Sequence, residues 1–308
     1  MASLLDRRLL VVTGKGGTGK TTVSAALGLA ATRRGKRAVV CEVARQERLG
    51  AMFGAGELGH AEREIAPGLY GISIDPDRAK EEWLRNQLHS GPLAGVLGHS
   101  RIFQYLTAAA PGLRELVTMG KVWDMAQLER RLAPGSYDLA IVDAPATGHG
   151  IAMLRAPKTY ADIARVGPIH RQATRIHGFV TDPACTGVVA VALPEEMPVN
   201  ETLELGARLR DELGMGVDQV VVNGLYPDRF TDGEAERLAS LDGAGSEAQR
   251  AALEAALSEH RRARAQRTEL RRLESEARAP VTTLPYLFQP DLGAEELELL
   301  SQELEPAL

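Results

Sequence analysis

Gly14-Lys15-Gly16-Gly17-Thr18-Gly19-Lys20-Thr21-Thr22 is the segment that says most about the architecture of this 308-residue chain. It fits the phosphate-loop pattern, in which a glycine, four residues of any kind and Gly-Lys-Thr follow one another. The apolar run Leu9–Val12 precedes it and predicts a buried strand. After it, apolar residues recur at helical spacing at Val23, Ala26, Leu27 and Ala30. Strand, glycine loop and helix therefore follow one another in the order that a phosphate site requires.

The residue types of this loop predict how it would hold a nucleotide. Glycines let the backbone wrap closely around phosphate oxygens, and the N–H groups at the start of the following helix face the anion. Lys20 is expected to reach the β- and γ-phosphates of ATP, and the Thr21 hydroxyl to hold Mg²⁺. The expected nucleotide-binding residues of the loop are Gly14, Gly16, Gly17, Thr18, Gly19, Lys20, Thr21 and Thr22. The alternative, a chance glycine-rich turn, does not account for the strand and the helix on either side.

Further apolar, β-branched runs alternate with helical stretches along the chain. They are near-continuous, which is typical of parallel strands covered on both faces. The predicted strands are Leu9–Thr13, Arg37–Glu42, Leu69–Ile74, Leu139–Asp143, Gly187–Leu193, Gln219–Asn223 and Val281–Leu284. We therefore expect an α/β fold with a doubly wound, mostly parallel sheet. We expect it to form a single domain over residues 1–308, with ligand beyond the carboxyl ends of the strands.

Two segments depart from this alternation of strands and helices. Residues 77–133 and 150–179 are helical in pattern, with expected breaks at Pro157, Gly167 and Pro168. We expect the two segments to form an α-helical subdomain inserted into the sheet. Two interpretations of their apolar residues stay open: ordinary core helices under the sheet, or a groove for a hydrophobic client.

A second chemical signal lies in Leu139–Asp143, an apolar run that ends in a carboxylate. An aspartate at such a strand end can orient Mg²⁺ directly or through its water. Pro145 and Gly148, which follow, fit a loop that rearranges with the γ-phosphate. Together with the phosphate loop, this run predicts a Mg²⁺ site made by Thr21 and Asp143.

Two details give the chain a specific resemblance to a known family. The early Lys15 gives the loop the form Gly-Lys-Gly-Gly-x-Gly-Lys-Thr-Thr, which resembles the deviant Walker A group of P-loop ATPases. Asp143-Ala144-Pro145-Ala146-Thr147-Gly148-His149 resembles the Asp-Thr-Ala-Pro-Thr-Gly-His segment of the arsenite-pump and tail-anchored-protein-targeting ATPases, with the proline one place early. The resemblance implies that Lys15 reaches across a dimer to the partner's nucleotide. A solvated surface lysine and a plain loop histidine are the alternatives for Lys15 and His149.

Three weaker matches follow in the same order as in the family. Leu193–Thr202 is similar to the Pro-Glu-x-x-x-x-x-Glu-Thr segment of relatives. Asn223 matches the asparagine that contacts adenine in relatives, and an amide supplies both a donor and an acceptor for the base edge. Leu284–Leu287 resembles the loop that closes over the base, which implies that Pro285 lies against it. A simple turn residue is the alternative for Asn223.

The chain departs from the family in its first switch segment and in its cysteines. The family carries Asp-Pro-Ala after the second strand, and that aspartate positions the attacking water, whereas Glu42 stands there without the proline. Glu42 either polarises the water from one methylene further out or is a structural residue at a strand end. Cys41 and Cys185 lie far apart, so neither a zinc-clamped dimer nor a thiolate cluster for arsenite is supported.

The charge and hydropathy of the chain limit which kinds of partner and location we expect. The net charge is −5, and arginines at 261–264 are interleaved with glutamates, so we expect no nucleic acid. Residues 234–279 predict a solvated helix with i,i+4 ion pairs, whose role stays open. The sequence lacks an apolar run of about 18 residues, so we expect no membrane span. It also lacks a signal-peptide layout, so we expect a cytoplasmic protein.

These observations lead to one functional hypothesis and one alternative. The resemblance implies a Mg-dependent ATPase that hydrolyses ATP to drive a conformational switch in a homodimer or in a dimer with a paralogous subunit. The switch would act on a protein or membrane-protein client. The candidate catalytic residues are Lys15, Lys20, Glu42 and Asp143. The alternative is a catalytically weak, nucleotide-gated module that binds a hydrophobic client segment.

Overall fold

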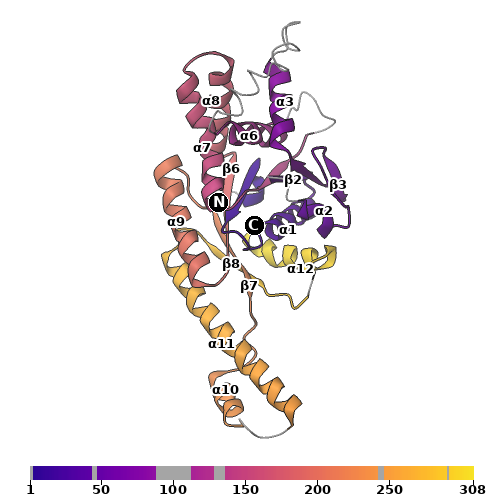
Figure 1. Cartoon of the computed structure of the whole chain (residues 1–308), viewed down its shortest axis with the longest axis vertical. Coiled ribbons are helices and arrows are strands. Elements are labelled where there is room, and N and C mark those ends of the chain that lie inside the picture. The colour runs from indigo at the N-terminus through magenta and orange to yellow at the C-terminus, as the bar shows by residue number, and fades with distance from the viewer. Residues whose placement is uncertain (1–2, 44–46, 88–111, 128–135, 242–245, 290) are drawn as a thin grey trace.

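A central sheet organises the computed structural model of the chain, which describes residues 3–43, 47–87, 112–127, 136–241, 246–289 and 291–308. In these residues the strands are β1 (Leu9–Gly14), β2 (Ala38–Val43), β3 (Arg63–Ala66), β4 (Leu69–Ile74), β5 (Leu139–Asp143), β6 (Thr186–Ala192), β7 (Gln219–Leu225) and β8 (Val281–Pro285). Their order across the sheet is β3-β4-β2-β5-β1-β6-β7-β8 (Figure 1). Neighbouring strands are parallel except β3, which runs antiparallel to β4. The doubly wound, mostly parallel α/β sheet is therefore confirmed.

All seven predicted strands are present, with ends that shift by at most two residues. The sequence did not predict β3, which pairs with β4 at the edge of the sheet. Its first two residues are exposed and its last two are only partly buried, so it lacks the near-continuous apolar run that marked the other strands. An edge strand with one polar side gives a weaker pattern than a strand buried on both faces.

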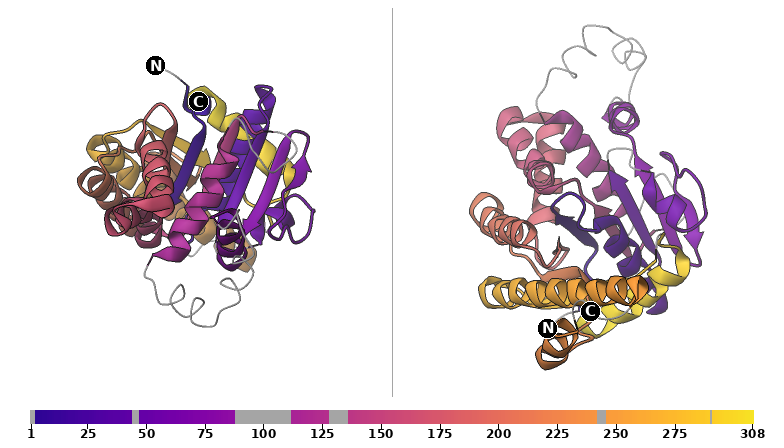
Figure 2. Two further views of the ribbon diagram at one scale, coloured as in Figure 1. Left: turned by 90° about the horizontal axis from the view of Figure 1, so that it is seen from above. Right: turned by 60° about the horizontal axis from the view of Figure 1, so that its bottom comes forward.

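Helices cover both faces of the sheet (Figure 2). On one face lie α1 (Lys20–Arg33), the short α2 (Arg48–Met52) and α12 (Ala294–Leu304), and their apolar residues share a core with Leu10 and Val12 of β1. On the other face lie α6 (Leu113–Met125), α7 (Thr147–Ala164) and α9 (Glu196–Leu213), which share a core with Leu9 and Val11. Successive strand residues point to opposite faces, so one apolar run serves two cores.

Helices α3 (Pro76–Gln87) and α8 (Gly167–Thr181) complete the helical segments predicted over 77–133 and 150–179. Met119, Val122 and Met125 of α6 are fully buried in the core shared with the sheet, which favours the core-helix interpretation for this helix. Residues 88–111 and 128–135 of the predicted subdomain lie outside the described residues.

The predicted break at Pro157 is wrong, because α7 continues through it. A proline inside a helix removes one hydrogen bond, and burial of its neighbours can offset that loss. Leu154, Pro157 and Ala161 are buried in this helix. The predicted break at Gly167 is confirmed, since α7 ends at Ala164 and α8 begins at Gly167, with φ +93°.

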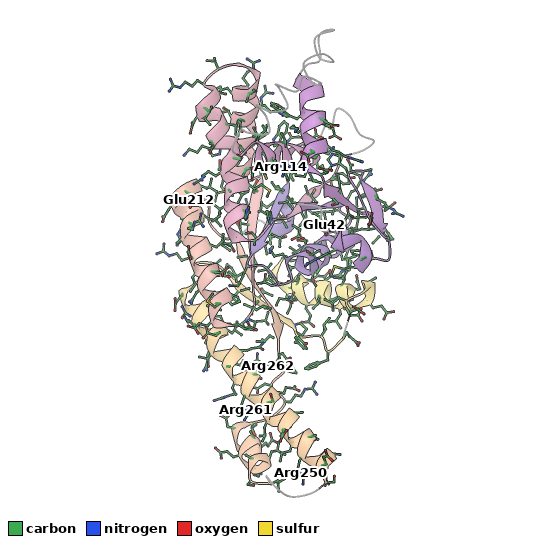
Figure 3. The ribbon with its side chains drawn as sticks, viewed as in Figure 1. Glu42, Arg114, Glu212, Arg250, Arg261 and Arg262 are labelled. Carbon is green, nitrogen blue, oxygen red and sulfur yellow. The ribbon has the colours of Figure 1, made fainter. Side chains whose placement is uncertain are left out.

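The charged segment predicted as one helix over 234–279 forms two helices, α10 (Asp232–Ala239) and α11 (Glu247–Glu276). Ser246 caps α11 through a capping box with Gln249, which starts a new helix. The far end of α11 and all of α10 project beyond the sheet as an arm (Figure 1). Arg250, Arg261 and Arg262 lie on α11, whereas Glu42 lies within the sheet (Figure 3). The predicted i,i+4 pairing occurs between Arg272 and Glu276, at 3.1 Å.

Candidate nucleotide-binding site

The predicted phosphate loop links β1 to α1 and needs its glycines. Gly14 has φ +147°, and a Cβ there would lie 2.2 Å from the carbonyl oxygen of Val191. Gly19 has φ +89°, and a Cβ there would lie 2.2 Å from the Asn223 amide nitrogen. A side chain at either position would strain the backbone and clash. Gly17 also has positive φ, but its Cβ position is open, so this part of the loop leaves space for a ligand.

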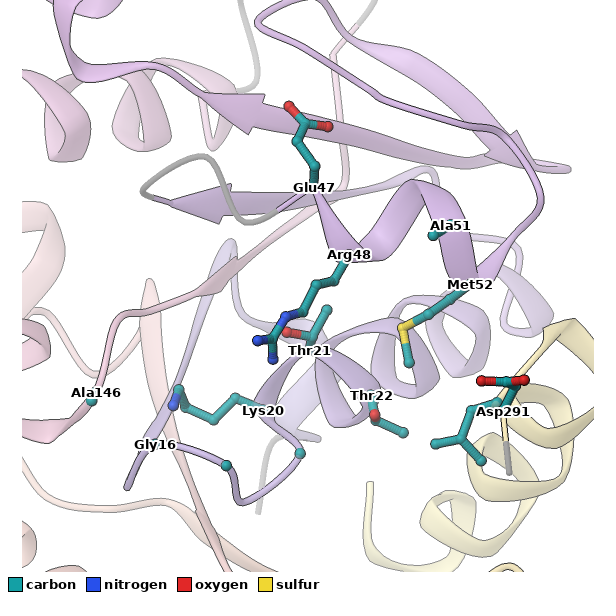
Figure 4. Close-up of a pocket in the computed structure, with 13 residues that line it drawn as sticks. Gly16, Lys20, Thr21, Thr22, Glu47, Arg48, Ala51, Met52, Ala146 and Asp291 are labelled. Carbon is teal, nitrogen blue, oxygen red and sulfur yellow. The ribbon is translucent and has the colours of Figure 1, made fainter. Parts of the chain in front are cut away.

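A cavity of about 840 Å³ opens in front of this loop (Figure 4). Its size is in the range of cofactor pockets, about 300–1,000 Å³. The lining residues come from the phosphate loop, α1, α2 and two later loops. They are Gly16, Gly17, Gly19, Lys20, Thr21, Thr22, Glu47, Arg48, Ala51, Met52, Ala146, Asp291 and Leu292.

Thr21 and Asp143, the predicted Mg²⁺ ligands, are in contact, and Thr21 lines the cavity whereas Asp143 does not. The Thr21 hydroxyl donates to Asp143 Oδ2 at 2.6 Å. Asp143 is buried, and its Oδ1 has no hydrogen-bond partner among the described residues. Burial raises the pKa of Asp143, against the opposing effects of the Thr21 hydrogen bond and of Lys20. A hydroxyl and a carboxylate with a free oxygen are hard oxygen donors, so these residues fit Mg²⁺.

Lys20 begins α1 and lines the cavity. Its ammonium donates to the carbonyl oxygen of Lys15 at 3.0 Å. Burial lowers the pKa of Lys20, Asp143 raises it, and Arg48 lowers it further. Lys20 is thus a partly desolvated cation beside an open space, which suits an anionic ligand.

Glu42 of β2 lies beside Asp143 of β5, because the two parallel strands pair with these residues opposite each other. Its side chain is fully buried and does not line the cavity. Oε1 accepts the N–H groups of Arg48 at 2.9 Å and Leu49 at 3.0 Å, and Oε2 has no partner among the described residues. Burial raises the pKa of Glu42, opposed by those two hydrogen bonds. Glu42 therefore anchors α2, and its role in orienting water stays a prediction.

Lys15 forms an ion pair with Glu201 of α9 in the same chain. Glu201 belongs to the segment that resembled the family's Pro-Glu motif. The carbonyl oxygen of Lys15 accepts the Thr18 hydroxyl at 3.0 Å as well as Lys20. The Lys15 ammonium is not among the groups that line the cavity of its own chain.

The two predicted adenine contacts, Asn223 and Pro285, lie in different surroundings. Asn223 donates its amide to the carbonyl oxygen of Thr18 at 3.0 Å and so supports the loop. Pro285 ends β8 and lines a second hollow of about 470 Å³, together with Tyr226, Tyr286 and Phe288. Neither Asn223 nor Pro285 lines the larger cavity, so their contact with a base stays a prediction.

Sequence reasoning did not identify Glu47, Arg48, Met52 and Asp291, which the structure adds to the cavity. Arg48 could have been found from its place shortly after the second strand, where relatives carry a switch. His149, predicted from the Thr-Gly-His segment, is exposed in the first turn of α7.

Strand β1, which leads into the phosphate loop, lies in a parallel sheet between β6 and β5, and β5 ends in Asp143. This arrangement defines the class of P-loop nucleotide-binding proteins. The sequence profile of the anion-transporting ATPases matches residues 7–166 and 162–254, and the chain belongs to this family. The resemblance to arsenite-pump and tail-anchored-targeting ATPases is thereby confirmed.

Relatives from several organisms match this chain. The chain is 32% identical over 226 residues to ATPase BagA of Mycobacterium tuberculosis, covering 71% of this chain and 66% of that relative. It is 24% identical to ATPase GET3C of Arabidopsis thaliana over 279 residues, 75% of this chain and 70% of the relative. It is 27% identical to an arsenical pump-driving ATPase of Acidiphilium multivorum, over 73% of this chain and 41% of the relative. The chain thus matches somewhat less than two thirds of the length of the first of these relatives.

The described residues also bear on membranes and metals. Among them, no helix has the length and apolar character needed to cross a bilayer. No group of three or more His, Cys, Asp or Glu side chains in the same residues is arranged to hold a metal ion. A Mg²⁺ site at Thr21 and Asp143 does not depend on such a group, since Mg²⁺ keeps several waters and binds substrate phosphates.

Proposed function

We propose that the chain binds Mg·ATP in the 840 Å³ cavity and hydrolyses it, transferring the γ-phosphoryl group to water. The observation that carries this proposal is the 2.6 Å contact between Thr21 and Asp143, with a buried carboxylate oxygen left unpartnered beside the glycine loop. Relatives named as ATPases support it. Residues 1–308 would act as one ATPase domain.

The predicted phosphate-binding and Mg²⁺-binding residues have roles that their positions support. The N–H groups of the loop and of the α1 N-terminus bind the phosphate oxygens, and Lys20 neutralises charge on the β- and γ-phosphates. Thr21 and Asp143 would hold Mg²⁺, which supplies further neutralisation of the phosphate oxygens when bound. The free Oε2 of Glu42, next to Asp143, is the candidate acceptor that orients the attacking water.

Lys15 would act in a dimer, on the nucleotide of a second copy or of a paralogous subunit. In the single chain its ammonium is paired with Glu201, so this ion pair must open before Lys15 reaches another subunit. Both side chains are about one third exposed, at 30% and 33%, which makes such an exchange inexpensive.

A second candidate function is a nucleotide-gated binding module with little turnover. Two observations favour it: Glu42 is fully buried, and apolar side chains are exposed where α7 meets α8. Ile163 is 69% and Val166 80% exposed there. In this proposal the helical segments 77–133 and 150–179 form a subdomain that binds a hydrophobic client.

Phosphate release and nucleotide binding, measured on the same purified protein, separate the two functions. The ATPase proposal predicts Mg-dependent phosphate release that is lost in Lys20→Ala. Binding of Mg·ATP without phosphate release supports the binding module instead. Unchanged phosphate release in Lys20→Ala contradicts the assignment of the loop.

A further inference from the structure

One cation of the cavity has no role in the predicted site. Arg48 is the first residue of α2, and its guanidinium points across the cavity toward Lys20 and Thr21 (Figure 4). The side chain is exposed, and within the described part of the chain it has no hydrogen-bond or ion-pair partner. A planar fork of N–H donors is therefore free at the open side of the phosphate loop.

The lining of the cavity places Arg48 beside the predicted phosphate and Mg²⁺ residues. Arg48 lines the cavity together with Lys20 and Thr21, and the Thr21 hydroxyl donates to Asp143 at 2.6 Å. Two cations that face one space repel each other until an anion lies between them. Lys20 is expected to reach the β- and γ-phosphates, and Thr21 and Asp143 are expected to hold the metal. Because the Arg48 guanidinium faces the same space, it would face the terminal phosphate.

Two carboxylates that precede Arg48 in the chain hold α2 in place. Glu42 accepts the N–H groups of Arg48 and Leu49, at 2.9 and 3.0 Å. Glu47 has φ +50°, unusual for a residue with a side chain, and its carboxylate accepts the N–H of Leu58 at 2.8 Å. Such an outlier persists only where its surroundings fix it, and such outliers cluster in ligand clamps and switches.

We propose that Arg48 contacts the γ-phosphate of ATP from within its own chain, so that α2 distinguishes the triphosphate from the diphosphate. The inference rests on the proposed function, since it needs ATP in the cavity. Arg48 would thus be a second cation from the same chain, beside Lys20, in addition to Lys15, which the family resemblance implies acts on the partner's nucleotide. A guanidinium is suited to this task because it binds two phosphate oxygens in parallel.

The test is calorimetric binding of Mg·ATPγS and Mg·ADP to the wild type and to Arg48→Ala. We expect Arg48→Ala to weaken Mg·ATPγS by about ten- to a hundredfold, the range for one charge-assisted contact, and Mg·ADP by less than about threefold. Arg48→Lys keeps the charge but loses the fork, so its loss for Mg·ATPγS should be smaller than that of Arg48→Ala. Arg171→Ala, an exposed arginine on α8, is the matched control and should change neither affinity.

The outcomes separate this inference from the function on which it rests. Equal losses for both nucleotides, or no loss for either, would overturn the γ-phosphate contact while leaving the ATP site intact. Failure of the wild type to bind either nucleotide would overturn the proposed function and the inference with it. Because Arg48 is exposed, its variants should keep the wild-type unfolding temperature, which a thermal melt verifies.

Discussion

The phosphate loop and the α2 segment face each other across one cavity but are held in different ways. The loop joins a buried strand to α1, a helix of 14 residues that is buried along most of its length. The α2 helix has five residues, and its N-terminus is fixed by the carboxylate of Glu42. Glycine geometry sets one wall, and hydrogen bonds to two side chains set the other.

This difference indicates which wall can change its conformation when a ligand binds. Elements with many buried apolar contacts open only with the whole fold, whereas short segments held by a few polar contacts open locally. We therefore assign nucleotide binding to the β1–α1 wall and discrimination of the γ-phosphate to the α2 wall. A variant that changes one wall should therefore leave the function of the other wall largely intact.

The largest effect is expected from Lys20→Ala in the loop wall. Loss of the cation that faces both phosphates should lower ATP turnover at least about a thousandfold and weaken ADP as well as ATPγS. Steady-state phosphate release and calorimetry check this result. If Lys20→Ala weakened only ATPγS, the β1–α1 wall would also distinguish ATP from ADP.

Next in size is Glu42→Gln, at the junction of the two walls. The amide oxygen can still accept the N–H groups of Arg48 and Leu49, so α2 stays anchored, but the charge that would orient water is lost. We expect turnover to fall about a hundredfold, with Mg·ATPγS binding within about threefold of the wild type. Single-turnover kinetics measure the first quantity and calorimetry the second. Wild-type turnover would restrict Glu42 to its anchoring role.

A smaller effect is expected from Gly50→Ala, which acts on α2 without touching the cavity. A Cβ at Gly50 would lie 1.9 Å from the carbonyl oxygen of Gly56, so α2 must move relative to the backbone at Gly56. Displaced α2 should bind Mg·ATPγS about three- to tenfold more weakly and leave Mg·ADP unchanged. Gly178→Ala on α8, where a Cβ meets nothing within 4 Å, is the matched control. Equal weakening of both nucleotides would argue that α2 does not discriminate between them.

The smallest effect concerns stability without nucleotide. Burial raises the pKa of Asp143, so the folded protein binds this proton more tightly than the unfolded chain does. The ionised carboxylate therefore costs stability above its folded pKa, and the cost disappears as the pH falls toward the unfolded pKa of about 3.9. Asp143→Asn should raise the unfolding temperature by about 2–4 °C near pH 7.5, and the difference should shrink on acidification.

Thermal melts over a pH series, without Mg²⁺ or nucleotide, measure this effect. Addition of Mg·ATPγS should then stabilise the wild type more than the variant, because Asp143 is a proposed Mg²⁺ ligand. A less stable variant at pH 7.5, or a difference that grows on acidification, would contradict a net cost of the buried carboxylate.

The sequence predicted one wall of the cavity well and the other poorly, for a physical reason. The loop from Gly14 to Thr22 is determined by local glycine geometry and by apolar runs on both sides, which are visible in the sequence. The position of α2 depends on hydrogen bonds that backbone N–H groups donate to the carboxylates of Glu42 and Glu47, and such bonds leave no periodic pattern in the sequence. The same reasoning explains why Glu42 was identified by its place in a motif while its contact with Arg48 was not.

Hydrogen–deuterium exchange can show whether α2, and not the phosphate loop, responds to the γ-phosphate. Exchange is compared without nucleotide, with Mg·ADP and with Mg·ATPγS, and peptides from α1 are read beside peptides that contain Arg48–Met52. We predict that both nucleotides slow exchange at the phosphate loop and the start of α1, and that only Mg·ATPγS slows it in α2. Equal protection of α2 by both nucleotides, or protection by neither, would contradict the account.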